Sequence, residues 1–158
     1  MLKEYEINES TQAIIPIDKE KSMVYEDNVE YLVNMPSNKI INYNCNFYGS
    51  SYLGRCEGTK SLVGIKTKYP IIIEESRNII FFPTSSTRGK QTNWISLNNI
   101  KKIIQHSKDT VIEFKNGHKI HVDISYYILN NQFCRATMLQ GKLFEHKLQK
   151  NSIQLKEK

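Results

Sequence analysis

The chain has 158 residues, of which 39% are hydrophobic and 24% charged, and its formal net charge is +6. This length suits a single domain with a substantial core, and the composition is that of a globular protein and not of a disordered chain. The longest apolar stretches, such as residues 71–73, are far shorter than the ~18 residues needed to cross a bilayer. The acidic N-terminus also lacks the apolar core of a signal peptide. We therefore expect one domain, residues 1–158, in the cytoplasm with no membrane partner.

The charge is unevenly distributed along the chain. Residues 1–34 contain three Lys and eight Asp or Glu, a net charge of −5, and the remainder has a net charge of +11. A basic body predicts a polyanionic partner. We expect the domain to consist of an acidic N-terminal strand pair at residues 1–34, a basic body at 35–148 and a frayed polar tail at 149–158.

Two strands open the predicted fold, at residues 12–17 and 23–33, with a polar turn between them. Residues 39–47 are rich in β-branched and aromatic side chains, which favour another strand. Small and polar residues, including four glycines, dominate residues 49–64. This stretch is therefore expected to be a loop with about one helical turn.

Two short apolar strands are predicted at residues 70–74 and 78–82, followed by a polar loop at 83–93 and a strand at 94–97. From Ser125 onward, apolar residues recur at spacings of three and four. This period predicts a helix over about residues 125–148, with Ser125 as its N-cap. We expect an α+β fold, a β-rich single domain of antiparallel strands and hairpins with one C-terminal helix.

A hairpin is predicted between residues 103 and 124, and its turn can be specified. A two-residue Asn-Gly turn would mix the two faces of the hairpin. A three-residue loop at residues 115–117 instead gives one apolar face, and Gly117 supplies the positive φ that the accompanying bulge requires. The residues on that face are Ile112, Phe114, Ile120 and Val122.

No catalytic or metal-binding motif is recognisable. The loop at residues 84–90 resembles a phosphate-binding loop, but it has Thr84 at the first glycine position and Gln91 after the Gly-Lys pair. His118 and His121 are three apart on a strand and point to opposite faces, so we expect the histidines to be solvated or structural. We therefore expect that the protein is not an enzyme and that it binds no cofactor and no metal ion. The cysteines form no Cys-x-x-Cys pair and are expected to be reduced and mostly packing residues, namely Cys45, Cys56 and Cys134.

A basic segment at residues 55–90 contains seven Lys or Arg and three Glu, a local net charge of +4. Hydroxyl-bearing residues and glycines surround these cations. Lys and Arg neutralise phosphates, while hydroxyl groups and the backbone N–H groups of glycine-rich loops donate to phosphate oxygens. This combination favours contact with a nucleic-acid backbone.

The same region resembles a known family. Residues 45–55, Cys-Asn-Phe-Tyr-Gly-Ser-Ser-Tyr-Leu-Gly-Arg, are similar to the hallmark segment of the ComK family of bacterial competence transcription factors. A second match is Phe-Phe-Pro-Thr-Ser-Ser-Thr-Arg at 81–88, followed by Trp-Ile-Ser at 94–96. A third and weaker match comprises residues 114–117, 124–125 and 132–136. The resemblance extends over about residues 33–143.

The resemblance implies a transcription activator of competence genes that binds A/T-rich boxes in double-stranded DNA, largely from the minor groove. It also implies a homodimer or a dimer of dimers on DNA, association with the nucleoid, and control by a protease adaptor. Members of the family extend beyond the position of Lys158, so any adaptor contact that needs their C-terminal tail is not implied here. A narrow A-tract minor groove attracts inserted arginine. Arg55 and Arg88, each next to a glycine in one of the matched motifs, are the candidates for this insertion. The predicted DNA-binding residues are Ser50, Ser51, Tyr52, Arg55, Thr84, Ser85, Ser86, Thr87, Arg88 and Lys90.

Two other functions are compatible with the sequence. The chain could be a protein-interaction or regulatory module that does not bind DNA and uses the acidic residues 1–34. It could also bind RNA or single-stranded nucleic acid, with Tyr48, Tyr52 and Trp94 as stacking platforms. For the two arginines, the alternative to DNA contact is a structural role in tying loops together.

Overall fold

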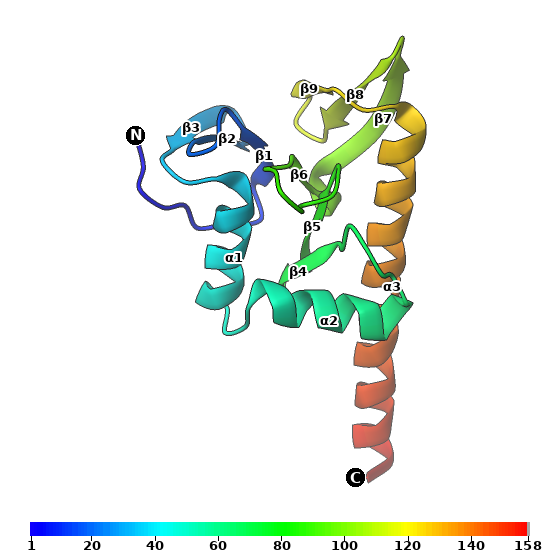
Figure 1. The fold of residues 1–158 in the computed structure, drawn as a ribbon. Helices are drawn as coiled ribbons and strands as arrows, with labels where there is room; N and C mark the ends of the chain where they lie inside the picture. The colour runs from blue at the N-terminus through cyan, green and yellow to red at the C-terminus, as the bar shows by residue number, and fades with distance from the viewer. Residues whose placement is uncertain (158) are drawn as a thin grey trace.

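The computed structural model describes residues 1–157, which form nine strands and three α-helices in an α+β arrangement (Figure 1). All strand pairs within the two sheets are antiparallel. The larger sheet has the order β3-β2-β1-β6-β5-β4 and comprises β1 (Thr11–Pro16), β2 (Ser22–Glu26), β3 (Val29–Val33), β4 (Ile71–Glu74), β5 (Ile79–Pro83) and β6 (Trp94–Ser96). The smaller sheet comprises β7 (Ile100–His106), β8 (Asp109–Phe114) and β9 (Lys119–Val122). The helices are α1 (Ser37–Phe47), α2 (Tyr52–Val63) and α3 (Tyr126–Glu157).

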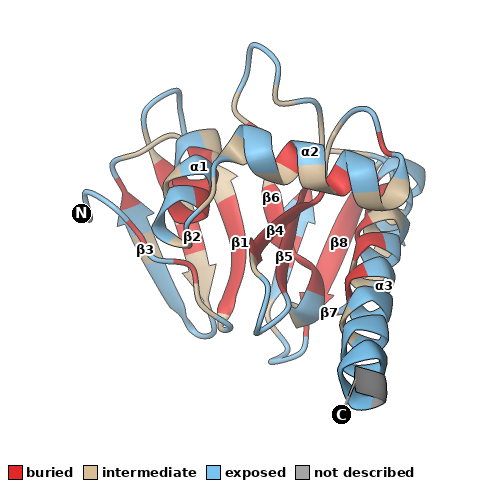
Figure 2. Cartoon of the chain, turned by 90° about the horizontal axis from the view of Figure 1, so that it is seen from below, coloured by how far each residue is buried: buried red, intermediate tan, exposed pale blue. Residues whose placement is uncertain are grey.

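The larger sheet lies between two apolar cores. One core fills the space between the sheet and helices α1 and α2, which lie across it (Figure 2), and includes Ile41 and Trp94. The other core lies between the sheet, the smaller sheet and α3, and includes Phe114 and Leu139. Because both faces of β5 are covered, all of its residues are buried, which explains its continuous apolar sequence. No helix among residues 1–157 is both long and apolar enough to span a membrane.

The strand predicted at residues 39–47 is wrong, because this segment belongs to α1. The buried side chains of α1 recur at spacings of three and four, namely Ser37, Ile40, Ile41, Asn44 and Cys45. That is the period of a helix with one face against a core. The β-branched residues here therefore reflect packing and not strand formation. The side chain of Asn44 also accepts a hydrogen bond from the Ile7 backbone N–H at 2.8 Å, which fixes the N-terminal segment against α1.

The loop predicted at residues 49–64 is also wrong, because most of it forms α2. Ser51 is the N-cap, and its Oγ accepts a hydrogen bond from the backbone N–H of Gly54 at 3.0 Å. Gly64 ends the helix in the left-handed conformation, with φ of +74°. Tertiary contacts outweigh the low helix propensity of the internal glycines. The hydroxyl of buried Thr59, for example, donates to the carbonyl of Pro70 at 2.6 Å.

The acidic N-terminal segment holds three strands and not the predicted pair. The stretch 23–33 is divided by a tight turn in which Glu26 pairs with Val29 and Asp27 has φ of +49°. Strand β1 pairs with β6, so this part of the chain is continuous with the larger sheet. The acidic and basic parts of the sequence therefore share one sheet.

The predicted three-residue turn of the hairpin is confirmed. Ile112 pairs with Ile120, the Phe114 backbone N–H donates to the His118 carbonyl at 2.8 Å, and Gly117 has φ of +90°. The apolar face predicted from this register lies in the core beneath α3. A further turn at residues 107–108 separates β7 from β8. The stretch predicted as one hairpin at residues 103–124 therefore contains parts of three strands.

Helix α3 begins as predicted and ends later than predicted. The Oγ of Ser125 accepts a hydrogen bond from the Ile128 backbone N–H at 3.3 Å, so the expected N-cap is confirmed. The helix then continues to Glu157, so its expected end near 148 is wrong, and Lys158 lies outside the described residues. Buried Leu139 and Leu143 lie on either side of Gly141 and hold the helix against the core there.

Candidate nucleic-acid interface

The two segments with the strongest motif matches meet beside α2. One is residues 45–55, which run from the end of α1 into the first turn of α2, and the other is residues 81–88, which lead from β5 into the loop at 84–93 before β6. The hydroxyl groups of Tyr52 and Thr87 are 3.2 Å apart, and the Tyr52 ring lies edge-on to Trp94 with a centroid separation of 6.3 Å. Burial raises the pKa of Tyr52 to about 12, further above neutral pH than the ordinary value of 10.0.

The loop at residues 84–93 is closed by its own polar groups. The backbone N–H of Thr84 donates to the carbonyl of Asn93 at 3.0 Å, and the hydroxyl groups of Ser85 and Thr92 are 2.7 Å apart. Thr84 is buried. These two predicted site residues therefore shape the loop, and its exposed polar surface is formed further along, by Ser86, Arg88 and Lys90.

The start of α1 fixes the far end of this loop. The side-chain amide of Asn38 donates to the carbonyl of Lys90 at 2.9 Å. The backbone N–H of Asn38 donates to the Gln91 side chain, also at 2.9 Å. Because α1 has no capping side chain of its own at Pro36, Gln91 supplies the missing acceptor. The Lys90 side chain is left exposed.

A groove with a volume of about 620 Å³ lies between α2, residues 66–69 and residues 86–88. A second hollow of about 590 Å³ is bordered by α1 and Gln91. Tyr52, Leu53 and Thr87 line both hollows, so they form the ridge between them. Four cations line the groove, opposed by the single carboxylate of Glu57, and they are Lys60, Lys66, Lys68 and Arg88.

Helix α3 holds one wall of the groove in place. The buried side chain of Gln132 donates to the carbonyl of Lys68 at 3.0 Å and to that of Pro83 at 2.8 Å. Arg135 donates to the carbonyl of Thr67 at 3.0 Å and to the Gln132 side chain at 2.6 Å. Sequence reasoning matched this segment to the family but assigned it no role. The signal was a polar residue, Gln132, on the apolar face of a helix.

The two arginines proposed for DNA contact differ in exposure. Arg88 is exposed in the groove wall, next to Gly89, whose φ is +73°. Arg55 is only half-buried, but its Nε is enclosed and has no hydrogen-bond partner among residues 1–157. Burial raises the pKa of the Cys45 thiol to about 12, and the nearby charge of Arg55 opposes part of this increase. Part of the Arg55 side chain therefore lies inside the protein.

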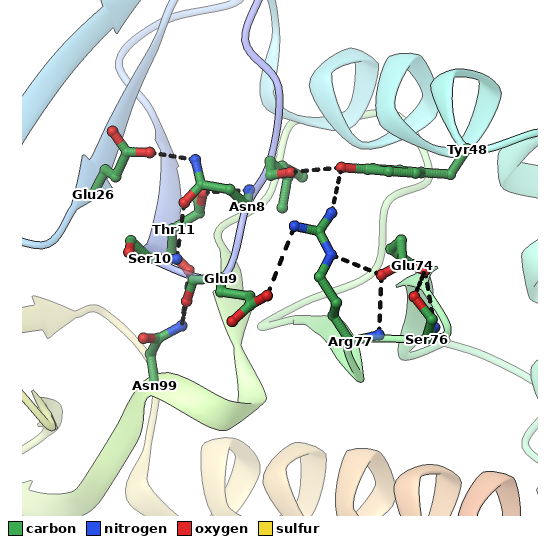
Figure 3. A network of polar contacts seen from close by, with 11 residues as sticks. Asn8, Glu9, Ser10, Thr11, Glu26, Tyr48, Glu74, Ser76, Arg77 and Asn99 are labelled. Atoms are coloured by element: carbon green, nitrogen blue, oxygen red, sulfur yellow. Dashed lines mark hydrogen bonds and ion pairs between the residues drawn. The ribbon is translucent and has the colours of Figure 1, made fainter.

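Arg77, which contributed to the charge of the basic segment, is neutralised by a network of its own (Figure 3). Its Nε lies 3.0 Å from the Glu74 carboxylate, and a second guanidinium nitrogen lies 3.7 Å from that of Glu9. Arg77 also donates to the hydroxyl of Tyr48 at 3.0 Å. Burial alone would raise the pKa of Glu74, but hydrogen bonds from Ser76 and Arg77 outweigh it and hold the pKa at about 2. Arg77 is therefore not a free cation for phosphate.

The stacking platforms proposed for single-stranded nucleic acid are largely occupied. Trp94 is fully buried, and its indole N–H donates to Asn38 at 3.0 Å. The hydroxyl of Tyr48 is engaged by the Arg77 network. Of the three cysteines, expected to be mostly packing residues, Cys45 and Cys56 are buried and Cys134 is exposed on α3.

Comparison with known proteins gives the same family as the sequence motifs. A family model described as ComK protein matches residues 2–148. Over 145 residues, covering 89% of this chain and 76% of the relative, the chain is 37% identical to the protein named Competence transcription factor of Bacillus subtilis (strain 168). No solved structure matches the chain significantly. The matched region includes both loops of the groove, α2 and the part of α3 that contacts them.

Proposed function

The chain belongs to the ComK family of transcription factors, and on this premise we propose that it activates competence genes by binding A/T-rich double-stranded DNA through the groove beside α2. The observation that carries this proposal is the excess of cations in the groove, where three lysines and Arg88 face only one carboxylate. The protein would act in the cytoplasm, at the nucleoid when it is bound to DNA.

The lysines supply affinity in this proposal. Each Lys that contacts a phosphate releases condensed counterions. The logarithm of the binding constant therefore falls by about one unit per contact for each tenfold increase in salt concentration. Lys60 projects from α2, whereas Lys66 and Lys68 lie on another wall, formed by the segment that follows the helix. Cations on two sides of a groove suit a polyanion that lies along it, and they position the DNA without reading its sequence.

Arg88 supplies the preference for A/T-rich DNA. The minor groove of an A-tract is narrow and has an enhanced negative potential, which favours an inserted guanidinium group. Arg88 is exposed in a loop that is held at both ends, so its side chain can enter the minor groove of the DNA. Arg55 is proposed as a second contact, through the part of its side chain that stays accessible.

Leu53 adds an apolar contact at the ridge between the two hollows. It is 73% exposed, in the first turn of α2. Proteins that bind the minor groove frequently insert an apolar side chain between base pairs, which unstacks a step and bends the duplex. We therefore include Leu53 as a wedge whose insertion bends the DNA.

Binding by more than one copy is part of the proposal. A groove with four cations contacts few phosphates, so the electrostatic affinity of one copy is limited. A homodimer or a dimer of dimers on neighbouring boxes multiplies the contacts, because the second copy binds at high effective concentration. Control by a protease adaptor is proposed from the family resemblance alone.

Fluorescence anisotropy with labelled duplexes tests the proposal. At about physiological salt, an A/T-rich duplex should bind more tightly than a G/C-rich duplex of equal length, and affinity should fall steeply with salt. An excess of single-stranded oligonucleotide should not displace the duplex. Equal affinity for the two duplexes would contradict sequence preference, and efficient displacement by single strands would favour a single-strand binder.

A further inference from the structure

Three side chains with metal-ligand chemistry meet on the outer face of the smaller sheet. His106 ends β7 and pairs with Asp109, which begins β8. His121 lies in β9 opposite Val111, two residues after Asp109, so all three side chains share one face. This cluster is at the end of the molecule away from α2 (Figure 1), and none of its members lines the groove.

The three side chains converge closely. The Nδ1 of His106 lies 3.0 Å from one carboxylate oxygen of Asp109, and the Nδ1 of His121 lies 3.3 Å from the other. Ligand atoms from the three residues all lie within 4.8 Å of one another. The two imidazole rings are nearly perpendicular, at 87°, with centroids 5.2 Å apart. Both rings are largely exposed, so an ion and its water can reach the cluster.

We propose that His106, Asp109 and His121 form a binding site for a divalent transition-metal ion, of which Zn²⁺ fits best. Two imidazoles and one carboxylate are a donor set for Zn²⁺, whereas Mg²⁺ and Ca²⁺ prefer oxygen ligands only. With bonds of ~2.0–2.2 Å, neighbouring ligands of a tetrahedral zinc ion lie about 3.3–3.5 Å apart. His106 and His121 approach different oxygens of Asp109, at 3.0 and 3.3 Å, so an ion held by one of these oxygens needs the exposed ring of the other histidine to rotate toward it.

The proposed ion joins three strands. It takes one ligand each from β7, β8 and β9, with water in the fourth position. Binding needs both imidazoles neutral, with the ring proton on Nε2, and Asp109 ionised. Because the three ligands converge only in the folded sheet, the ion binds the native state preferentially and raises its stability.

Titration calorimetry with zinc chloride tests the site, monitored in parallel by thermal unfolding. The parent protein carries Cys134→Ser, because the exposed thiol of Cys134 would itself bind Zn²⁺. We expect one ion per chain and a higher unfolding midpoint with Zn²⁺ but not with Mg²⁺. His106→Ala and His121→Ala should each lower the affinity for Zn²⁺ at least about tenfold.

Two further variants make the result decisive. His146→Ala removes an exposed histidine of α3 outside the cluster and should leave zinc affinity unchanged. Asp109→Asn keeps the shape of the side chain but removes its charge, and it should weaken zinc binding even if an alanine variant fails to fold. Unchanged zinc affinity in both Asp109→Asn and the two alanine variants, or loss of binding in His146→Ala alone, would overturn the proposal.

Discussion

The hydroxyl group of Tyr52 lies 3.2 Å from that of Thr87, and this contact joins the first residue of α2 to the loop between β5 and β6. The two residues are 35 positions apart in the sequence, yet both border the groove and the second hollow. Because this contact links α2 to the residue before Arg88, we expect it to set the width of the proposed DNA-binding groove.

A double-mutant cycle on this pair tests that dependence. Tyr52→Phe and Thr87→Val each remove the hydrogen bond, and each should weaken binding to an A/T-rich duplex roughly two- to tenfold. The double variant should be little weaker than either single variant, because the bond can be lost only once. Thr137→Val, which removes a hydroxyl from the exposed side of α3, is the matched control. Fully additive effects on affinity would show that the contact does not act as a unit.

Arg88 and the groove lysines should affect different properties of DNA binding. Arg88→Ala should weaken binding to A/T-rich DNA by roughly 1–3 kcal/mol and reduce the preference over G/C-rich DNA. Lys66→Ala should lower the salt slope by about one unit and leave the preference unchanged. Lys108→Ala, in the turn after β7, is the control and should change neither quantity. Anisotropy titrations at several salt concentrations measure both, and a Lys66 variant with altered preference would contradict these roles.

Arg55 should behave differently from Arg88 because part of its side chain is enclosed. Arg55→Ala should weaken DNA binding by roughly 1–3 kcal/mol and also lower the free energy of unfolding by roughly 1 kcal/mol through lost packing. Arg88→Ala should leave the free energy of unfolding unchanged. Denaturant unfolding of the two variants, together with duplex titrations, separates the effects. A stability loss with unchanged DNA affinity would leave Arg55 a purely structural residue.

Sequence reasoning predicted the parts of the fold that depend on local chemistry. The turn that contains Gly117 was predictable because only one loop length puts Ile112 and Ile120 on the same face. Helix α1 was missed although its signal was present, since Ile40, Ile41 and Asn44 follow the period of a helix. The β-branched composition of this segment favours a strand, but the spacing is the stronger signal because it shows which face is buried.

Other features depended on contacts that no local pattern encodes. Helix α2 is held by Thr59 against Pro70, and its caps are separated by a glycine-containing stretch that resembles a loop. At the site, the motifs singled out Tyr52 and Arg88, which the structure brings to one groove, but they did not indicate the groove itself, which Lys60 completes. The neutralisation of Arg77 by Glu9 was equally hidden, because the two residues are distant in the sequence.

Leu53→Ala should reduce DNA bending if the side chain acts as a wedge. Loss of the inserted side chain should weaken binding on the order of 1–2 kcal/mol and bring the measured bend closer to that of free DNA. Energy transfer between dyes at the two ends of an A/T-rich duplex reports the bend. Leu148→Ala, which truncates another exposed leucine on α3, is the control. An unchanged bend at saturating Leu53→Ala protein would exclude the wedge.

Glu74 should make the stability of the protein sensitive to acid. Its pKa is about 2 in the folded protein, whereas an unperturbed glutamate has a pKa of about 4.3. The folded state thus favours the ionised carboxylate, and the resulting stabilisation is fully present above about pH 5 and is lost as the pH falls toward 2. Protonation removes the negative charge that strengthens the hydrogen bonds from Ser76 and Arg77, and so weakens the hold on Arg77, which links the β4–β5 turn to Tyr48.

Glu74→Gln isolates this contribution. The variant should be less stable than the wild type above pH 5, and the difference in free energy of unfolding should shrink as the pH falls, because the wild type then loses the charge that the variant already lacks. Denaturant unfolding between pH 7 and the lowest pH at which the protein stays folded measures the difference. The adjacent variant Glu75→Gln is the control, since the Glu75 carboxylate makes no ion pair within residues 1–157. A stability difference between wild type and Glu74→Gln that does not vary with pH would show that the Arg77 network holds the turn without the charge of Glu74.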